Sequence, residues 1–297
     1  MTAHCRGSGL RRIVVATTSR TGPHMRLAAA LRRLLAAVLV AAPLPCLAAE
    51  AVDLELVIAT DVSYSIDREE ARLQREGVAN AFLSREVIEA IRTGTHGKIA
   101  VAYIDFASTP FNVLVLDWRV IRDQVTAAAF AQDLLKAPIN RGQHTSISSG
   151  LVMGADLIDR NAFQGTRRVI DVSGDGPNNY ENRVDHVRDA VLAQQIVING
   201  LPIMNEADSW RSRYYLPDLD RYFEGCVTGG PGSFVVPATD FKDFARAIKK
   251  KLVLEIAGLT PPAPARIMKA QAPGGAGYAR GCDIGERMRY GAWGDVP

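Results

Sequence analysis

The chain lacks several features that would assign it to a common functional class. Its 297 residues carry a formal net charge of only +3, too small to indicate a nucleic-acid-binding protein. It contains no Gly-x-Ser-x-Gly nucleophile motif and no phosphate-binding P-loop. Histidine and cysteine number five and four, and they form no cluster that would suit zinc. The hydrophobic fraction of 47% is nevertheless that of an ordinary globular protein.

The apolar run near the N-terminus is too short to span a membrane, which requires roughly 20 residues. Residues 34–42 are apolar, follow Arg32 and Arg33, and precede two prolines and the small residues Ala48 and Ala49. This order predicts a secretory signal peptide that is cleaved after Ala48 or Ala49. We expect the true start at Met25, because residues 1–24 do not resemble a leader. A buried N-terminal helix and lipidation at Cys46 are the alternatives.

We therefore expect three parts: a leader at residues 1–48, one domain at residues 49–259, and a Pro/Gly-rich tail at residues 260–297. Cys5 and Cys46 fall in the leader, so the mature chain keeps Cys226 and Cys282. In an oxidising compartment these two are expected to form a disulfide that ties the tail back to the domain. Two unpaired thiols are the alternative. We expect no transmembrane segment in the mature chain and a periplasmic or secreted location.

Strand-like and helix-like segments alternate along the mature chain. This alternation predicts a doubly wound α/β fold with a mostly parallel sheet and helices on both faces. The short spacing between the second and third strands predicts one antiparallel edge strand. Residues 205–232 are expected to be a surface loop, and residues 249–251 a solvated lysine cluster. We expect strands at 52–60, 98–105, 111–118, 167–173, 196–203 and 233–237, and helices at 66–91 (or a pair), 123–136, 146–159, 184–194 and 240–256, the last capped by Asp240.

Oxygen-bearing side chains follow or precede these elements at three places. Asp61, Ser63 and Ser65 come directly after the first strand, Thr145 precedes a helix, and Asp175 follows a later strand. Ligands of open α/β sheets bind outside the carboxyl ends of the strands. Two carboxylates and three hydroxyls are hard ligands that suit Mg²⁺.

Each of these residues, taken alone, is as readily explained as a helix cap or a turn former. Their joint occurrence at strand ends and a helix start favours a metal site. Asn178 and Asn179, which follow Asp175, are interpreted as turn formers. Tyr64 is either part of the rim of the site or a packing residue, and His144 is interpreted as a solvated loop histidine.

The order Asp61-x-Ser63-x-Ser65, Thr145 and Asp175 resembles the metal-ion-dependent adhesion site (MIDAS) of von Willebrand factor A (vWA) domains. The resemblance covers roughly residues 52–257. It implies that Ser63, Ser65 and Thr145 coordinate Mg²⁺, or Mn²⁺ or Ca²⁺, directly, and that Asp61 and Asp175 act mainly through water. It also implies an open position for an acidic group of a protein partner. Segments VIDVSGDGPNN (169–179), INGLPI (198–203) and KKLVLEIAG (250–258) are similar to an uncharacterised group of exported bacterial proteins with this fold.

Three functions follow from this interpretation. The first is a binding module that presents a divalent cation to a protein partner, and it is the one that we expect. The second is a metal-dependent hydrolase or phosphotransferase with Asp61 as nucleophile. Ser63 occupies the place of the second aspartate of the Asp-x-Asp pattern, and no lysine follows Thr145 closely, so we expect no enzyme. The third is a structural envelope protein with a vestigial site.

Overall fold

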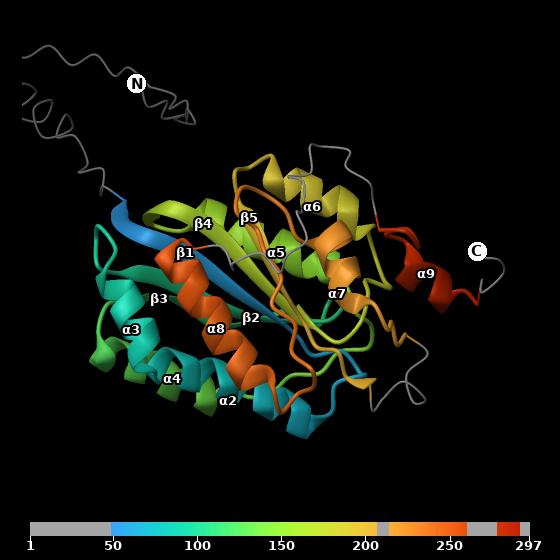
Figure 1. Cartoon of the computed structure of the whole chain (residues 1–297), viewed down its shortest axis with the longest axis horizontal. Coiled ribbons are helices and arrows are strands. Elements are labelled where there is room, and N and C mark those ends of the chain that lie inside the picture. The colour runs from blue at the N-terminus through green and yellow to red at the C-terminus, as the bar shows by residue number, and fades with distance from the viewer. Residues whose placement is uncertain (1–48, 207–213, 260–277, 292–297) are drawn as a thin grey trace, which may run out of the picture. The chain divides into compact units, whose positions relative to one another are not determined.

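A five-stranded sheet forms the centre of the protein (Figure 1). A computed structural model of the chain describes residues 49–206, 214–259 and 278–291. The strands lie in the order β3-β2-β1-β4-β5, and β3 alone is antiparallel to its neighbour. This arrangement confirms the predicted doubly wound fold with one antiparallel edge strand. The strands are β1 (Glu50–Asp61), β2 (Ile99–Phe106), β3 (Val113–Ile121), β4 (Phe163–Gly174) and β5 (Val197–Pro202).

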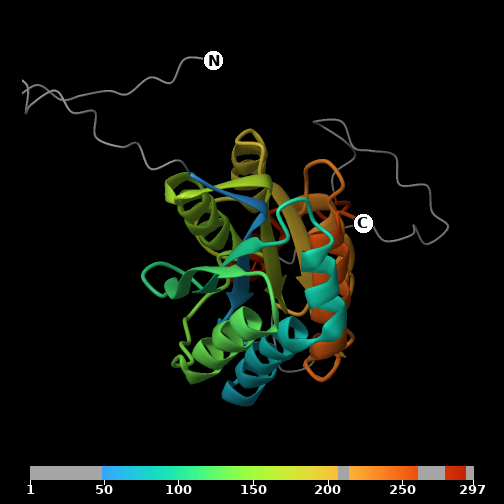
Figure 2. The ribbon, with the colours of Figure 1, turned by 90° about the vertical axis from the view of Figure 1, so that its left-hand side faces the viewer.

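Helices cover both faces of the sheet (Figures 1 and 2). Two separate clusters of buried apolar side chains, one on each face, hold the layers together. One face packs against α2 (Arg68–Leu83), α3 (Arg85–Arg92), α4 (Gln124–Lys136) and α8 (Phe244–Ala257). The other packs against α5 (Ile147–Arg160), α6 (Val184–Leu192), α7 (Leu219–Tyr222), the short π-helix η2 (Phe223–Val227) and α9 (Ile284–Arg289).

The central strand β1 determines where the functional residues meet. Its side chains alternate between the two cores, as for Leu56 and Val57, because successive residues of a strand point to opposite faces. In the parallel register, Asp61 lies beside Phe106 of β2, and Thr60 lies beside Ser173 of β4. The segments that follow β1, β2 and β4 therefore leave the sheet at the same edge.

Side-chain caps fix where the helices begin. The segment predicted at 66–91 is a pair, because Ser84 ends α2 and begins α3. The Ser84 hydroxyl accepts the N–H of Val87 at 3.4 Å, while its own N–H bonds to the carbonyl of Ala81. Asp67 and Asp123 cap α2 and α4 in the same way, and Ser146 caps α5. Such caps satisfy amide groups that have no partner within the helix.

Two predictions in the C-terminal half are wrong. Residues 233–237 do not form a strand; their one bridge to β5 is the isolated pair of Gly200 and Val235. Pro202 and Pro237 lack the N–H groups that a continuous ladder needs. The described part of residues 205–232 is not a surface loop, because it contains α7 and η2. Tyr222 and Phe223 are fully buried, so these aromatic residues complete the second core.

The prediction for α8 also needs two corrections. Asp243, rather than Asp240, precedes the helix, and Asp240 accepts the N–H of Asp243 at 2.8 Å. Lys251 is fully buried rather than solvated. Its Nζ lies 2.5 Å from Oδ1 of Asp171 and 3.2 Å from Oε1 of Glu255. Burial raises the pKa of Asp171 to about 8, and the attraction of Lys251 only partly opposes this effect.

The C-terminal segment contains a helix that the sequence analysis did not predict. The predicted disulfide joins Cys226 of η2 to Cys282, two residues before α9. The predicted leader at residues 1–48 and residues 260–277 of the predicted tail lie outside the described residues. Among the helices of the described ranges, none has the length and apolarity required to cross a membrane.

Candidate metal centre

Asp61, the last residue of β1, is the buried centre of the predicted site. Its side chain is fully buried, and Oδ1 accepts the N–H of Ser63 at 2.8 Å. Its second oxygen, Oδ2, is also buried and has no hydrogen-bond partner in the described part of the chain. Gly174 leaves room for this carboxylate, since a Cβ at that position would lie 3.1 Å from Oδ2. A buried carboxylate oxygen without a donor is an expected position for an interaction with a cation.

A continuous network of hydrogen bonds joins the other four residues of the predicted site. The hydroxyl of Thr145 donates to Oγ of Ser63 at 3.0 Å, and the hydroxyls of Ser63 and Ser65 are 3.1 Å apart. Ser65 then donates to Oδ1 of Asp175 at 2.8 Å. The structure thus brings together all five residues that the sequence analysis selected, from three separate segments of the chain.

The two carboxylates of this cluster repel each other. The pKa of Asp61 is raised well above its usual value, first by burial and second by the negative charge of Asp175. The hydrogen bond from Ser63 opposes this shift only in part. Two carboxylates and three hydroxyls form a donor set that fits a hard divalent ion. The described residues contain no group of three or more His, Cys, Asp or Glu suited to a metal, so a site here depends on its hydroxyls.

Backbone hydrogen bonds fix the loop that carries Thr145. Gly142 donates to the carbonyl of Val62 at 2.9 Å, which ties this loop to the residue that follows β1. Ser146 donates to the carbonyl of Ala107 at 2.5 Å, just after β2. A Cβ at Gly142 would lie 2.3 Å from that of Ala107, so this close approach requires glycine. Thr145 is therefore positioned by the ends of two strands.

Asn178 and Asn179 are positioning residues that the sequence analysis interpreted only as turn formers. Both are buried. Asn179 accepts the N–H of Thr145 at 3.1 Å through its side chain and donates its own N–H to the Thr145 carbonyl at 2.9 Å. Asn178 accepts the N–H of Ser148 at 3.0 Å. These bonds lock the loop after Asp175 to the start of α5. Two adjacent amides after a strand-end aspartate were the only sequence signal for this role.

The C-terminal helix α9 packs directly on the same loop. Gly285 lies against Asn178, because a Cβ on Gly285 would be only 2.1 Å from the Asn178 carbonyl oxygen. The Asn178 side chain donates to Oε1 of Glu286 at 2.7 Å. The Asn178 N–H also donates to the hydroxyl of Tyr222 at 3.2 Å. The segment held by the disulfide therefore supports the loop that carries Asp175.

Aromatic and basic side chains lie on the segments that carry or contact the cluster, and we call five of them the rim. The side chain of Tyr64 is 61% exposed, and the guanidinium of Arg141 lies 5.4 Å from its ring centre. The ring of His144 stacks on Tyr180 at 4.7 Å, and the guanidinium of Arg289 lies 4.4 Å from the Tyr180 ring. Burial, followed by the charge of Arg289, lowers the pKa of His144. The rim consists of Tyr64, Arg141, His144, Tyr180 and Arg289.

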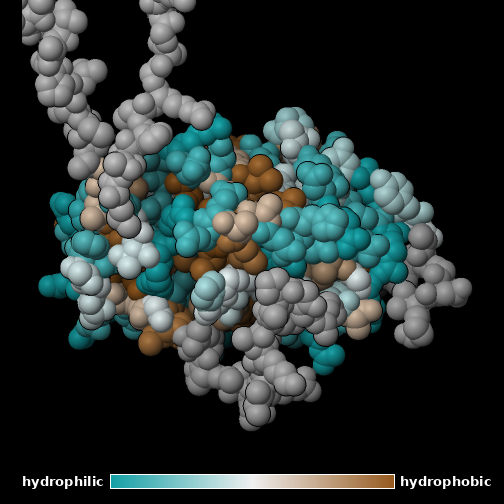
Figure 3. Space-filling view, turned by 90° about the horizontal axis from the view of Figure 1, so that it is seen from above, coloured by the Kyte–Doolittle hydropathy of each residue, from teal (hydrophilic) through white to brown (hydrophobic). Residues whose placement is uncertain are grey.

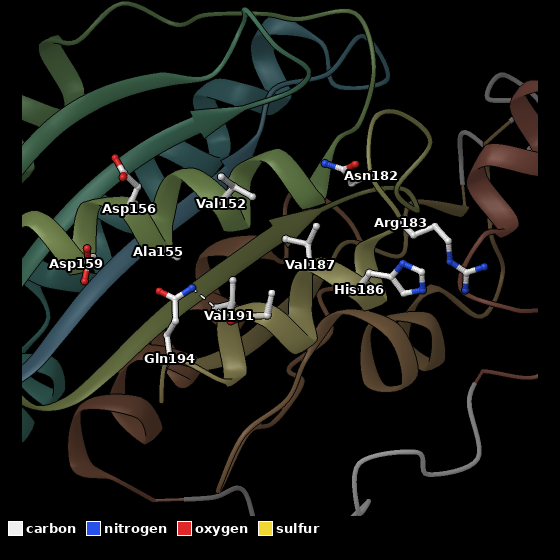
Figure 4. Close-up of a pocket in the computed structure, with 11 residues that line it drawn as sticks. Val152, Ala155, Asp156, Asp159, Asn182, Arg183, His186, Val187, Val191 and Gln194 are labelled. Atoms are coloured by element: carbon white, nitrogen blue, oxygen red, sulfur yellow. Dashed lines mark hydrogen bonds between the residues drawn. The ribbon is translucent and has the colours of Figure 1, made fainter.

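A shallow groove of about 440 Å³ lies between α5 and α6, away from the predicted ligands. Figure 3 shows the molecule from above relative to Figure 1, and on this side apolar surface is surrounded by polar residues. In the groove itself, Val152 and Val187 lie between Asp156 and Asp159 on α5 and His186 on α6 (Figure 4). None of the five predicted site residues lines it.

Comparison with known proteins gives a family and no activity. The family described as Protein of unknown function (DUF1194) matches residues 51–260. No curated protein matches the chain. Similar solved structures include proximal thread matrix protein 1 from the mussel byssus. It is 13% identical, its TM-score is 0.49, and the alignment covers 70% of this chain and 48% of that chain. A second is von Willebrand factor type A from Catenulispora acidiphila, with 12% identity, a TM-score of 0.47, and 69% of this chain and 43% of that chain covered. A third is BatB from Bacteroides thetaiotaomicron, with 16% identity, a TM-score of 0.43, and 69% of this chain and 99% of that chain covered.

The chain spans less than half the length of the first two of these structures. At these identities and TM-scores, the likeness assigns neither a ligand nor a partner. The family match is of a different kind, because residues 51–260 are well over half of the 297 residues and include Asp61, Thr145 and Asp175. The chain therefore belongs to the family of proteins of unknown function DUF1194.

Proposed function

We propose that this protein is an exported binding module that presents a divalent cation, Mg²⁺ by preference, to an acidic group of a protein partner. The observation that supports this most is the convergence of five oxygen-bearing side chains from three segments. They are joined by hydrogen bonds of 2.8 to 3.1 Å, and Oδ2 of Asp61 is buried without a partner.

The chemistry of the donor set favours recognition. Ser63, Ser65 and Thr145 offer neutral hydroxyl oxygens, which leave most of the positive charge of a bound ion uncompensated. Asp61 and Asp175 would balance that charge from a greater distance. An ion held in this way attracts a further carboxylate, and Mg²⁺ usually keeps several exchangeable waters that such a group can replace.

Export is part of the proposal. The disulfide between Cys226 and Cys282 supports an oxidising compartment, because disulfides are rare in the cytosol. A periplasmic or secreted location, cleavage of residues 1–48 as a leader, and a folded domain at residues 49–259 are the corresponding proposals.

The test is metal-dependent stabilisation in purified protein from which divalent ions have been removed. Mg²⁺ at about 100 times its dissociation constant should raise the free energy of unfolding by about 2.7 kcal/mol, because only the folded state binds it. Asp61→Asn and Thr145→Ala should abolish this gain, measured as the shift of the melting temperature on adding Mg²⁺. Thr93→Ala is the matched control, since Thr93 caps the far end of α3. A wild-type melting temperature that responds to none of Mg²⁺, Mn²⁺ and Ca²⁺ would contradict the proposal.

A further inference from the structure

We propose that the described C-terminal segment, residues 278–291, forms one side of the recognition surface and that Arg289 binds a second acidic side chain of the partner. The partner would then be a polypeptide segment with two acidic residues a few positions apart: one meets the cation, and the other meets the Arg289 guanidinium. This inference rests on the proposed function and goes beyond it by assigning a second contact.

The C-terminal segment is held firmly enough to present a side chain in a fixed place. The disulfide anchors Cys282 to η2, and the ring of Tyr278 packs edge-on against Tyr222 at 5.6 Å. Gly285 contacts the backbone of Asn178, as described above, and Tyr222 donates to the carbonyl of Cys282 at 3.5 Å. Figure 1 shows α9 on the side of the molecule toward which β1 and β4 run. The segment thus lies beside the loop that carries Asp175.

Arg289 is arranged to bind an anion from outside. Its guanidinium lies 4.4 Å from the ring centre of Tyr180 and 5.6 Å from that of Tyr290, so aromatic rings support it. Tyr290 is 78% exposed, which places this end of α9 at the surface. Within the described residues, Arg289 forms no ion pair and no hydrogen bond with a carboxylate. A guanidinium that stacks through its face keeps the N–H groups at its edge for an acceptor.

The position of Arg289 connects it to the metal centre. Tyr180 also stacks on His144, the neighbour of Thr145, with ring centres 4.7 Å apart. The Tyr180–Arg289 stack is therefore separated from a predicted cation ligand by a single side chain. The adjacent Glu181 is engaged elsewhere, because it accepts hydrogen bonds from the Ser146 hydroxyl at 2.6 Å and from the Thr109 N–H at 3.0 Å.

The other side of the rim has the same character. Arg141 stacks on Tyr64 and donates to the Tyr64 carbonyl at 3.1 Å. Like Arg289, it forms no ion pair with any described residue. Two guanidiniums that form no ion pair within the described ranges thus stack on tyrosines of the segments that carry the predicted ligands. This charge arrangement suits an acidic polypeptide segment better than a neutral one.

The probes are fluorescein-labelled decapeptides of Gly and Ser that carry either one Asp or two Asp residues separated by one to four positions. Binding to the full chain is measured by fluorescence anisotropy, with Mg²⁺ and with EDTA. In Mg²⁺ we expect the best two-Asp peptide to bind about tenfold more tightly than the one-Asp peptide, as for one added charge-assisted contact. Arg289→Gln should remove this difference, so that the one-Asp and two-Asp peptides bind with equal affinity. Arg160→Gln removes the same charge from the distant end of α5 and should alter neither affinity.

The outcomes separate the two proposals. Mg²⁺-dependent binding with equal affinities for both kinds of peptide would overturn the role of Arg289 and leave the proposed function intact. An equal loss for both peptides in Arg289→Gln would also overturn it, since that pattern indicates a general effect on the site. Peptide binding of equal strength in Mg²⁺ and in EDTA would overturn the proposed function, and with it the proposal that the partner contacts both the cation and Arg289. If Arg289→Gln fails to fold, two measurements still test the role of Arg289. One is the affinity difference between the one-Asp and two-Asp peptides in wild type, and the other is the same difference in Arg289→Lys, which we expect to be smaller than in wild type.

Discussion

Replacing Lys251 with methionine tests how the buried charges beneath the sheet are balanced. Lys251 is fully buried on α8, with Nζ 2.5 Å from Asp171 and 3.2 Å from Glu255, which are 1% and 2% exposed. Oδ2 of Asp171 and Oε2 of Glu255 already lack a described hydrogen-bond partner. Methionine has nearly the same length and keeps the packing, but it leaves the buried carboxyl groups of Asp171 and Glu255 without the ammonium group that they contact. We expect the free energy of unfolding to fall by about 3–5 kcal/mol.

The matched control is Lys250→Met on the adjacent, exposed position of the same helix. It removes the same charge from the surface and should change the free energy of unfolding by less than about 0.5 kcal/mol. Urea denaturation followed by circular dichroism measures both variants against wild type. Equal urea midpoints for Lys251→Met and Lys250→Met would refute the reasoning, because the buried lysine would then contribute no more to the free energy of unfolding than the exposed one.

The same cluster predicts a dependence of stability on pH. The pKa of Asp171 is raised from 3.8 to about 8 in the folded protein, chiefly by burial, so between these values the folded state holds a proton that the unfolded state releases. This contribution to the free energy of unfolding therefore decreases as the pH rises from about 4 to about 8. Asp171→Asn should reduce that slope in urea titrations at several pH values. A slope as steep in Asp171→Asn as in wild type would assign the pH dependence to other groups.

Two further predictions concern the support of the metal centre from α9. In Gly285→Ala, the new methyl group would meet the Asn178 carbonyl oxygen at 2.1 Å, so the loop or the helix must move. We expect a loss of about 1–3 kcal/mol in stability and faster amide hydrogen exchange in residues 175–181. Gly154→Ala is the control, because its methyl group would lie 3.0 Å from the side-chain end of Ile170 and not against the loop, and it should leave that exchange unchanged. Equal exchange in both variants would argue against this support. Removing the disulfide in Cys226→Ser/Cys282→Ser opens a loop with a sequence separation of 56 residues and should cost about 4 kcal/mol in the free energy of unfolding, measured under non-reducing conditions. A midpoint equal to that of wild type would contradict the anchoring role.

Much of the fold could be predicted because it depends on local pattern. Residues 52–60 are almost continuously apolar, which fits a strand buried on both faces, and β1 covers them. The spacing of β2 and β3 was enough to predict their antiparallel pairing. The failures have tertiary causes. Tyr222 and Phe223 appear in a polar, turn-rich stretch, and only their packing under β5 shows that they belong to the core.

The candidate site also has residues that the sequence predicts and residues that only the tertiary structure identifies. The sequence alone determined the five oxygen-bearing residues, because parallel strands end at one edge of a sheet and bring the following residues together. It also determined the cysteine pair, because only two cysteines follow the predicted leader. Only the tertiary structure decided what surrounds them: the buried Lys251, the asparagines that lock Thr145, and the packing of α9 on Asn178. These depend on contacts between segments up to about a hundred residues apart, such as Asn178 and Glu286, and no local pattern encodes which distant residue will fill a given space.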